Sequence, residues 1–151
     1  MKIAVIGAGN WGINLVRNLN DLGVLSHVAE AVPELRDRVL SETVDIALLD
    51  DYRPLLDADI NGVAIATPVP THATIAAEFL AAGKDVFVEK PMTFTVAEAE
   101  DLVERANKQE RILMVGHLLL YQPAIAWIKE YLDAGKLGKV FSFHQERMKL
   151  G

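Results

Sequence analysis

The sequence predicts an α/β protein with a doubly wound parallel sheet of the Rossmann type, arranged in three layers. Short, nearly continuous apolar runs alternate with longer segments of helical periodicity along the whole chain. This alternation is typical of parallel strands that are covered by helices on both faces. A glycine-rich turn also separates the first apolar run from the first helical segment, which is where Rossmann folds bind the phosphates of a dinucleotide.

Six apolar runs have the length and composition of buried strands. In order, they cover residues 3–6, 24–30, 46–49, 63–66, 86–89 and 112–115. Helices are expected between them, over residues 10–22, 33–40, 53–56, 71–82 and 95–109. Gly23 and Gly83 are expected to end helices, because glycine adopts the positive φ of that position at little cost. Thr95 and Glu98 form the pattern of a capping box.

The end of the sequence predicts one more helix and one more strand. The helix is expected over residues 122–134 and the strand over residues 139–148. That strand has no later partner in the sequence. We therefore expect residues 1–121 to be a dinucleotide-binding domain, and residues 122–151 to be a connecting helix and the first strand of a missing C-terminal α/β domain. On this view the chain is a fragment.

Composition excludes several classes of function. The chain has 151 residues, 51% hydrophobic and 24% charged, with a net charge of −6, which disfavours nucleic acid and anionic lipid as partners. It has no cysteine, so a disulfide scaffold and a thiolate metal site are excluded, and we expect no metal. No apolar stretch approaches the roughly 20 residues of a membrane helix, and no signal peptide is visible. We expect a cytoplasmic protein.

A G-x-G-x-x-G pattern opens the first expected helix. Gly7 would allow a tight turn, Gly9 would let a pyrophosphate touch the backbone, and Gly12 would permit close packing of helix on strand. The phosphates would then lie at the helix N-terminus, where free N–H groups attract an anion. Asn10 and Trp11, within the same loop, are therefore also predicted to contact the cofactor. A glycine turn without a ligand is the alternative.

Glu30 ends the second expected strand, 18 residues after Gly12. The spacing is close to the ~20 residues expected of the carboxylate that accepts hydrogen bonds from the ribose hydroxyls. A 2′-phosphate would meet a like charge there, so NAD is expected in preference to NADP. Arg36 and Arg38 follow on the next expected helix, and their positive charges leave NADP as the alternative cofactor. Alternatively, Glu30 only leads into that helix.

Two further segments, together with the glycine loop, resemble the glucose–fructose oxidoreductase and inositol dehydrogenase family. They read ATPVPTH over residues 66–72 and AGKDVFVEKP over residues 82–91. The resemblance implies an NAD-dependent oxidoreductase that transfers hydride from a secondary hydroxyl of a sugar or nucleotide sugar to nicotinamide. It also implies a second α/β domain with a large open sheet and, in the full-length protein, a homo-oligomer.

The resemblance assigns roles to the end of the fifth expected strand. Glu89, Lys90 and Pro91 would lie beside the nicotinamide, with a cis peptide commonly preceding the proline. Glu89 would hold ribose hydroxyls, while Lys90 would bind the substrate hydroxyl and steady the alkoxide. Lys90 is therefore the predicted catalytic residue. An exposed Glu-Lys pair before a turn proline is the alternative.

Two other segments are assigned in the same way. Thr67, Pro68 and His72 resemble a loop that lies along the cofactor, although His72 could also be a helix-terminal residue without a ligand. The segment GHLLLY over residues 116–121 is similar to the branch that oxidises C3 of UDP-N-acetylglucosamine or its uronic acid. In that branch His117 and Tyr121 would face the sugar. A capped strand-end histidine and a core tyrosine are the alternatives.

Two other functions stay open on the sequence alone. The chain could be a stand-alone NAD-binding sensor or regulatory module without turnover. It could also be part of a dehydrogenase of inositol or another cyclic polyol. The gene sequence beyond codon 151 would separate the sensor from the enzyme.

Overall fold

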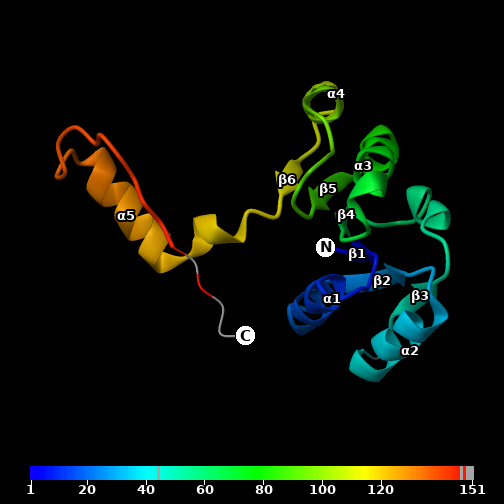
Figure 1. The fold of residues 1–151 in the computed structure, drawn as a ribbon. Helices are drawn as coiled ribbons and strands as arrows, with labels where there is room; N and C mark the ends of the chain where they lie inside the picture. Colours follow the sequence, from blue (N-terminus) through cyan, green and yellow to red (C-terminus); the bar gives the residue numbers. More distant parts are fainter. Residues whose placement is uncertain (44, 147, 149–151) are drawn as a thin grey trace. The chain divides into compact units, whose positions relative to one another are not determined.

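The computed structural model describes residues 1–43, 45–146 and 148 (Figure 1). The chain divides into two compact units, Met1–Gly116 and His117–Gly151. Among the described residues, no helix is long and apolar enough to cross a membrane.

A six-stranded parallel sheet forms the centre of the first unit (Figure 1). Its strands are β1 (Ile3–Ile6), β2 (Leu25–Ala29), β3 (Ala47–Leu49), β4 (Gly62–Ile65), β5 (Asp85–Val88) and β6 (Leu113–Val115). They lie in the order β3-β2-β1-β4-β5-β6. The order reverses between β1 and β4, and doubly wound folds bind ligands beyond the carboxyl ends of the strands at such a switch point. The predicted fold class is confirmed, and all six strands lie where the apolar runs placed them.

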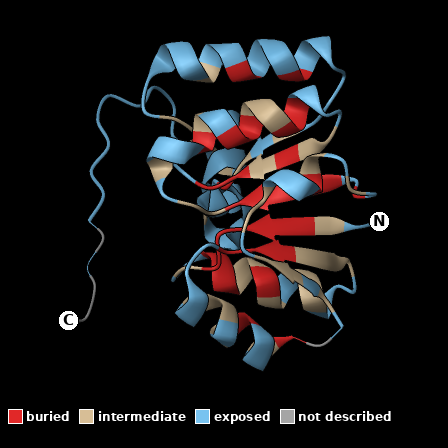
Figure 2. Cartoon of the chain, turned by 90° about the vertical axis from the view of Figure 1, so that its right-hand side faces the viewer, coloured by how far each residue is buried: buried red, intermediate tan, exposed pale blue. Residues whose placement is uncertain are grey.

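Helices cover both faces of this sheet, because successive residues of each strand point to opposite sides. Val5, Val28 and Ala64 pack on one face with residues of α1 (Gly12–Asp21) and α2 (Pro33–Glu42). Ala4, Ile6, Val63, Ile65, Val86 and Val88 pack on the other face with residues of α3 (His72–Ala81) and α4 (Val96–Lys108). Figure 2 shows the buried residues gathered in the strands and on the helix sides that face them.

The predicted helix ends are confirmed, with one addition. Gly23 has φ +66° and Gly83 has φ +72°. The Thr95 hydroxyl accepts a hydrogen bond from the Glu98 amide, and the Glu98 carboxylate accepts one from the Thr95 amide. Beyond the end of α4, Glu110 has φ +52°. This left-handed residue was not predicted, because no glycine marks it.

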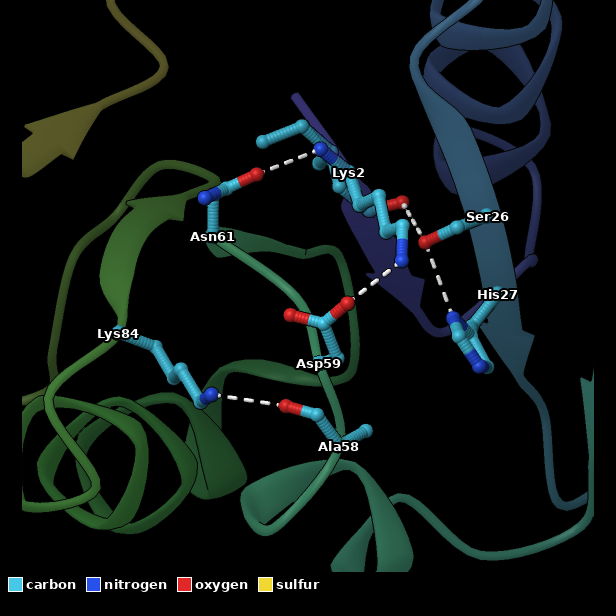
Figure 3. Close-up of polar contacts among 8 residues, drawn as sticks. Lys2, Ser26, His27, Ala58, Asp59, Asn61 and Lys84 are labelled. Atoms are coloured by element: carbon cyan, nitrogen blue, oxygen red, sulfur yellow. Dashed lines mark hydrogen bonds and ion pairs between the residues drawn. The ribbon is translucent and has the colours of Figure 1, made fainter.

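Polar contacts hold the amino-terminal end of the sheet, opposite the switch point (Figure 3). The Lys2 amide donates to Asn61 Oδ1 over 2.7 Å, and the Lys2 ammonium lies 2.6 Å from Asp59. The Lys84 ammonium donates to the Ala58 carbonyl over 2.8 Å. The hydrogen bond from Lys2 lowers the pKa of Asp59. These contacts fasten β1 and the turn before β5 to the segment before β4. The pair of Lys2 with exposed Asp59 is of a kind that contributes little to stability.

Two 3-10 turns connect elements of the first unit. They are η1 (Arg53–Leu56), which follows β3, and η2 (Val69–Thr71), which leads directly into α3. The helix predicted over residues 71–82 therefore begins with a tighter turn and continues as α3 from His72.

The second unit contains η3 (Leu118–Tyr121) and α5 (Pro123–Asp133). The helix expected over residues 122–134 is confirmed. The strand expected over residues 139–148 is not formed, since residues 139–146 and Met148 have no regular structure, and Arg147 lies outside the described residues. A strand needs a neighbour for its backbone N–H and C=O groups, and the described part of the chain supplies none to this segment.

We predict that Phe79→Ala lowers the free energy of unfolding by about 3 to 5 kcal/mol, because Phe79 is fully buried between α3 and the sheet and its loss leaves a cavity. The control is Phe94→Ala, which removes a ring that is 68% exposed and should change stability by no more than about 0.5 kcal/mol. Urea titrations followed by circular dichroism measure both. Equal losses in the two variants would contradict the assigned core.

Candidate dinucleotide-binding site

A pocket of about 850 Å³ lies at the carboxyl ends of the strands around the switch point. Its walls come from the glycine loop, the end of β2 with the turn that follows it, residues 50–53 after β3, and the loop after β4. Its volume falls within the range of small-molecule and cofactor sites, roughly 300 to 1,000 Å³. The pocket brings together Gly7, Gly9, Glu30, Thr67 and Pro68 of the predicted site.

The three glycines of the loop have different structural roles. Gly7 has φ +86°, and a Cβ there would lie 2.9 Å from the backbone of Ala66 and Thr67. A Cβ at Gly12 would overlap the carbonyl oxygen of Gly7. A Cβ at Gly9 would meet no protein atom within 4 Å. The fold therefore requires Gly7 and Gly12, whereas the space at Gly9 lies open to a ligand.

The start of α1 suits an anion. Trp11 is its N-cap residue and makes no side-chain cap hydrogen bond, and no acidic residue lies in the first turn. The Ile13 and Asn14 amides already donate to the carbonyls of Gly9 and Trp11. The Gly12 amide has no hydrogen-bond partner among the described residues and is available to a phosphate. Exposed Asn10 precedes Trp11 in the loop.

Glu30 is 7% exposed and anchored by two backbone amides. Ala8, between Gly7 and Gly9, donates to one carboxylate oxygen over 2.6 Å, and Val32 donates to the other over 2.8 Å. A carboxylate has about four acceptor positions, so Glu30 retains capacity for ribose hydroxyls. Its predicted role at the ribose stays a prediction, and its contact with Ala8 links β2 to the glycine loop.

The surroundings of Glu30 are rich in acid. Asp50 and Asp51 also line the pocket, and Arg53 lies 2.8 Å from Asp51 as an ion pair. Arg36 donates two hydrogen bonds to backbone carbonyls, those of Glu30 and Ala31, over 2.8 and 2.9 Å. The sequence interpretation missed residues 50–53 as pocket residues. Their position directly after the third strand could have revealed them, since parallel strands end at the same edge of the sheet.

Glu89 is a second buried carboxylate, 7% exposed, at the end of β5. It accepts a hydrogen bond of 2.6 Å from the indole N–H of Trp11. A Cβ at Gly116 would lie 2.9 Å from Glu89 Oε1, so Gly116 makes room for this carboxylate, a role the sequence did not reveal. Lys90 is exposed, and the peptide between Lys90 and Pro91 is cis, as the resemblance implied.

His72, the first residue of α3, is 1% exposed. Its Nε2 lies 2.8 Å from the carbonyl oxygen of Thr67, and its Nδ1 lies 3.0 Å from that of Pro91. The ring therefore bridges the loop after β4 and the segment after β5. Both ring nitrogens already contact backbone carbonyls, and direct contact of His72 with the cofactor stays a prediction.

His117 and Tyr121 belong to the second unit. Tyr121 is the last residue of η3 and is 70% exposed. His117 is the N-cap residue of η3 and is also exposed. Exposure shows that Tyr121 is not a core residue of this unit. Their predicted contact with a sugar stays a prediction.

Comparison with known proteins gives a consistent result. Residues 1–117 match a family described as "Oxidoreductase family, NAD-binding Rossmann fold". The chain is 31% identical over 143 residues to scyllo-inositol 2-dehydrogenase (NAD(+)) of Bacillus subtilis, covering 92% of this chain and 42% of that protein. It is 30% identical over 152 residues to UDP-N-acetylglucosamine 3-dehydrogenase of Acidithiobacillus ferrooxidans, covering 91% and 45%.

A solved structure agrees with these relatives. The crystal structure of a putative oxidoreductase from Magnetospirillum magnetotacticum has a TM-score of 0.78 and 34% identity, and the match covers 88% of this chain and 43% of that one. The chain thus spans less than half the length of each of these three proteins.

We predict that Gly9→Val removes NAD(H) binding while leaving the free energy of unfolding within about 0.5 kcal/mol, because the new side chain would occupy only the open space where a pyrophosphate would lie. Gly12→Ala is the matched comparison and should destabilise the fold by about 1 to 3 kcal/mol, as overpacking does. Calorimetric titration and urea unfolding are the measurements. Unchanged NADH affinity in Gly9→Val would show that the phosphates bind elsewhere.

Proposed function

This chain belongs to the oxidoreductase family with an NAD-binding Rossmann fold that matches its residues 1–117, and on that basis we propose that it is the cofactor-binding part of a dehydrogenase that acts on a secondary hydroxyl of a sugar or nucleotide sugar. The observation that carries the proposal is the open space at Gly9, beside a helix N-terminus without a side-chain cap and within a pocket that also holds Glu30. Bound NAD would supply the hydride acceptor.

The charges of the pocket support NAD in preference to NADP. Glu30, Asp50 and Asp51 place carboxylates along the pocket, and a 2′-phosphate there would meet like charges. Arg36 already donates to the carbonyls of Glu30 and Ala31. The pocket therefore favours neutral ribose hydroxyls, which can donate hydrogen bonds to Glu30.

Lys90 supplies the electrophilic group of the proposed reaction. Its ammonium is exposed just beyond the carboxyl end of β5, the edge of the sheet that bears the pocket. We propose that it donates a hydrogen bond to the substrate oxygen and stabilises the alkoxide left when the hydroxyl proton passes to a base of the further domain proposed below. The hydride would then leave from the carbon that bears this oxygen, and the alkoxide would become a ketone. Glu89, held by Trp11, would accept hydrogen bonds from the nicotinamide ribose.

Two substrate classes have support. The segment over residues 116–121 favours a nucleotide sugar, in which case His117 and Tyr121 would contact it, and a UDP-N-acetylglucosamine 3-dehydrogenase is among the relatives. A cyclic polyol is the second candidate, since two inositol dehydrogenases match with 31% and 32% identity.

The lengths of the relatives bear on what completes the site. Because the chain spans 42% to 45% of the relatives described above, we propose that residues 122–151 begin a further domain that supplies most of the substrate pocket. We also propose that the complete enzyme is a cytoplasmic homo-oligomer.

We predict that NADH binds this chain roughly tenfold or more tightly than NADPH, the scale of repulsion between like charges in a partly buried site. Glu30→Gln should reduce the ratio of NADH affinity to NADPH affinity, because it removes the charge and keeps an acceptor oxygen. Glu34→Gln, at an exposed position in the first turn of α2, is the control and should leave the ratio of the two affinities unchanged. Calorimetric titration decides, and equal affinities in the unmodified chain would count against the role of Glu30.

We predict that the isolated chain binds NAD but oxidises neither UDP-N-acetylglucosamine nor scyllo-inositol, as followed by the absorbance of reduced nicotinamide. In a form that carries a substrate domain, Lys90→Met should lower kcat by ~10² or more, the usual effect of losing a positioned acid, base or oxyanion partner. Lys108→Met, at an exposed position in α4, is the control. Efficient turnover by the isolated chain, or a normal kcat in Lys90→Met, would refute the corresponding part of the proposal.

A further inference from the structure

Lys90 lies between two residues whose polar groups are held by side chains from distant parts of the chain. The carboxylate of Glu89 accepts the indole N–H of Trp11 over 2.6 Å. The carbonyl of Pro91 lies 3.0 Å from Nδ1 of His72. Among the described residues, the Lys90 ammonium has no hydrogen-bond partner. The neighbours of Lys90 are thus anchored while its charged group remains free.

The sheet itself does not fix this segment. The Glu89 amide donates to the Ile65 carbonyl over 2.9 Å, which extends the ladder between β4 and β5 by one residue. Beyond Glu89, a hydrogen bond from a distant element reaches the backbone at Pro91, whose carbonyl contacts His72. Met92 also packs against the core, so His72 is one of two contacts that hold the chain where it leaves β5.

The chemistry of His72 restricts how it can hold Pro91. Both of its partners, the carbonyl oxygens of Thr67 and Pro91, only accept hydrogen bonds. A neutral imidazole carries one N–H, whereas an imidazolium carries two. Pro91 is held only if Nδ1 bears a proton. The ring is 1% exposed, so water cannot readily replace a lost contact.

We propose that His72 and Trp11 are positioning residues for Lys90, which fix residues 91 and 89 on either side of it. This inference rests on the proposed catalytic role of Lys90. A long lysine side chain directs its ammonium accurately only if its own backbone is fixed, because site geometry must hold to within about 0.5 Å. Trp11 belongs to the glycine loop, so its bond to Glu89 also sets the segment bearing Lys90 relative to the predicted phosphate site.

The first test uses the unmodified chain. ¹⁵N chemical shifts of the His72 ring, measured by NMR at pH 7, distinguish protonated from unprotonated nitrogens. We expect a protonated Nδ1. An unprotonated Nδ1 would mean that Pro91 is not held and would overturn the role of His72.

The second test uses two matched variants of His72. The amide nitrogen of asparagine approximates the position of Nδ1, whereas that of glutamine approximates Nε2. His72→Asn should keep the donor to Pro91 and lose the one to Thr67, and His72→Gln should do the reverse. We expect the ¹⁵N order parameters of the Lys90 and Met92 amides to stay near 0.85 in His72→Asn and to fall toward about 0.6 in His72→Gln. Equal values in the two variants would overturn the proposal, since a merely structural histidine does not distinguish its two nitrogens in this way.

Trp11→Phe keeps the aromatic ring and removes the donor to Glu89, at a position that is 45% exposed. The Lys90 amide still donates to Glu89 over 3.2 Å in this variant, and it tests the proposal independently of the His72 variants. The Lys90 amide should again become more mobile, while the control Trp127→Phe, in the second unit, should leave it unchanged. An unchanged order parameter in Trp11→Phe would remove Trp11 from the proposal.

NADH titration of the unmodified chain separates this inference from the proposed function. Failure of NADH to bind, with the expected order parameters, would refute the proposed function and leave the positioning role of His72 and Trp11 supported. Normal NADH binding, with equal order parameters in the two His72 variants, would refute the positioning role alone.

Discussion

The hydrogen bond from the Ala8 amide to the Glu30 carboxylate sets the geometry on which the rest of the site depends. A carboxylate as buried as Glu30 is costly unless its oxygens are paired, and the glycine loop supplies that pairing. The Gly7 amide donates to the Ala29 carbonyl beside it. The loop must therefore pass close to the end of β2 before α1 begins, and this course requires the positive φ of Gly7.

A second buried carboxylate binds the same loop from β5. Glu89 accepts from Trp11 as Glu30 accepts from Ala8, so the loop is attached to strands on both sides of β1 and β4. The loop that would hold a pyrophosphate therefore has its shape before a ligand binds, and such preorganisation lowers the entropic cost of binding.

Sequence patterns predicted the local features of this fold and missed those that depend on contacts between distant residues. The strands, the capping box at Thr95 and the glycine helix ends follow from short-range chemistry, and all were predicted. The bond between Trp11 and Glu89 joins residues 78 positions apart, and no pattern in the sequence indicates it. The same holds for the closeness of Gly116 to Glu89. The strand expected over residues 139–148 failed for the complementary reason, because alternating residues alone do not supply a pairing partner.

The position of Trp11 has a spectroscopic consequence. The chain has two tryptophans, and the indole of one of them is bonded to a carboxylate at the predicted nicotinamide end of the site. Indole emission overlaps the absorption band of a reduced nicotinamide, so excitation energy would pass from Trp11 to a dihydronicotinamide ring bound near Glu89. With Trp127 replaced, the tryptophan fluorescence of this protein would come from the glycine loop alone. The fold thereby carries its own optical label, at the point where the phosphate-binding loop meets the residues next to Lys90.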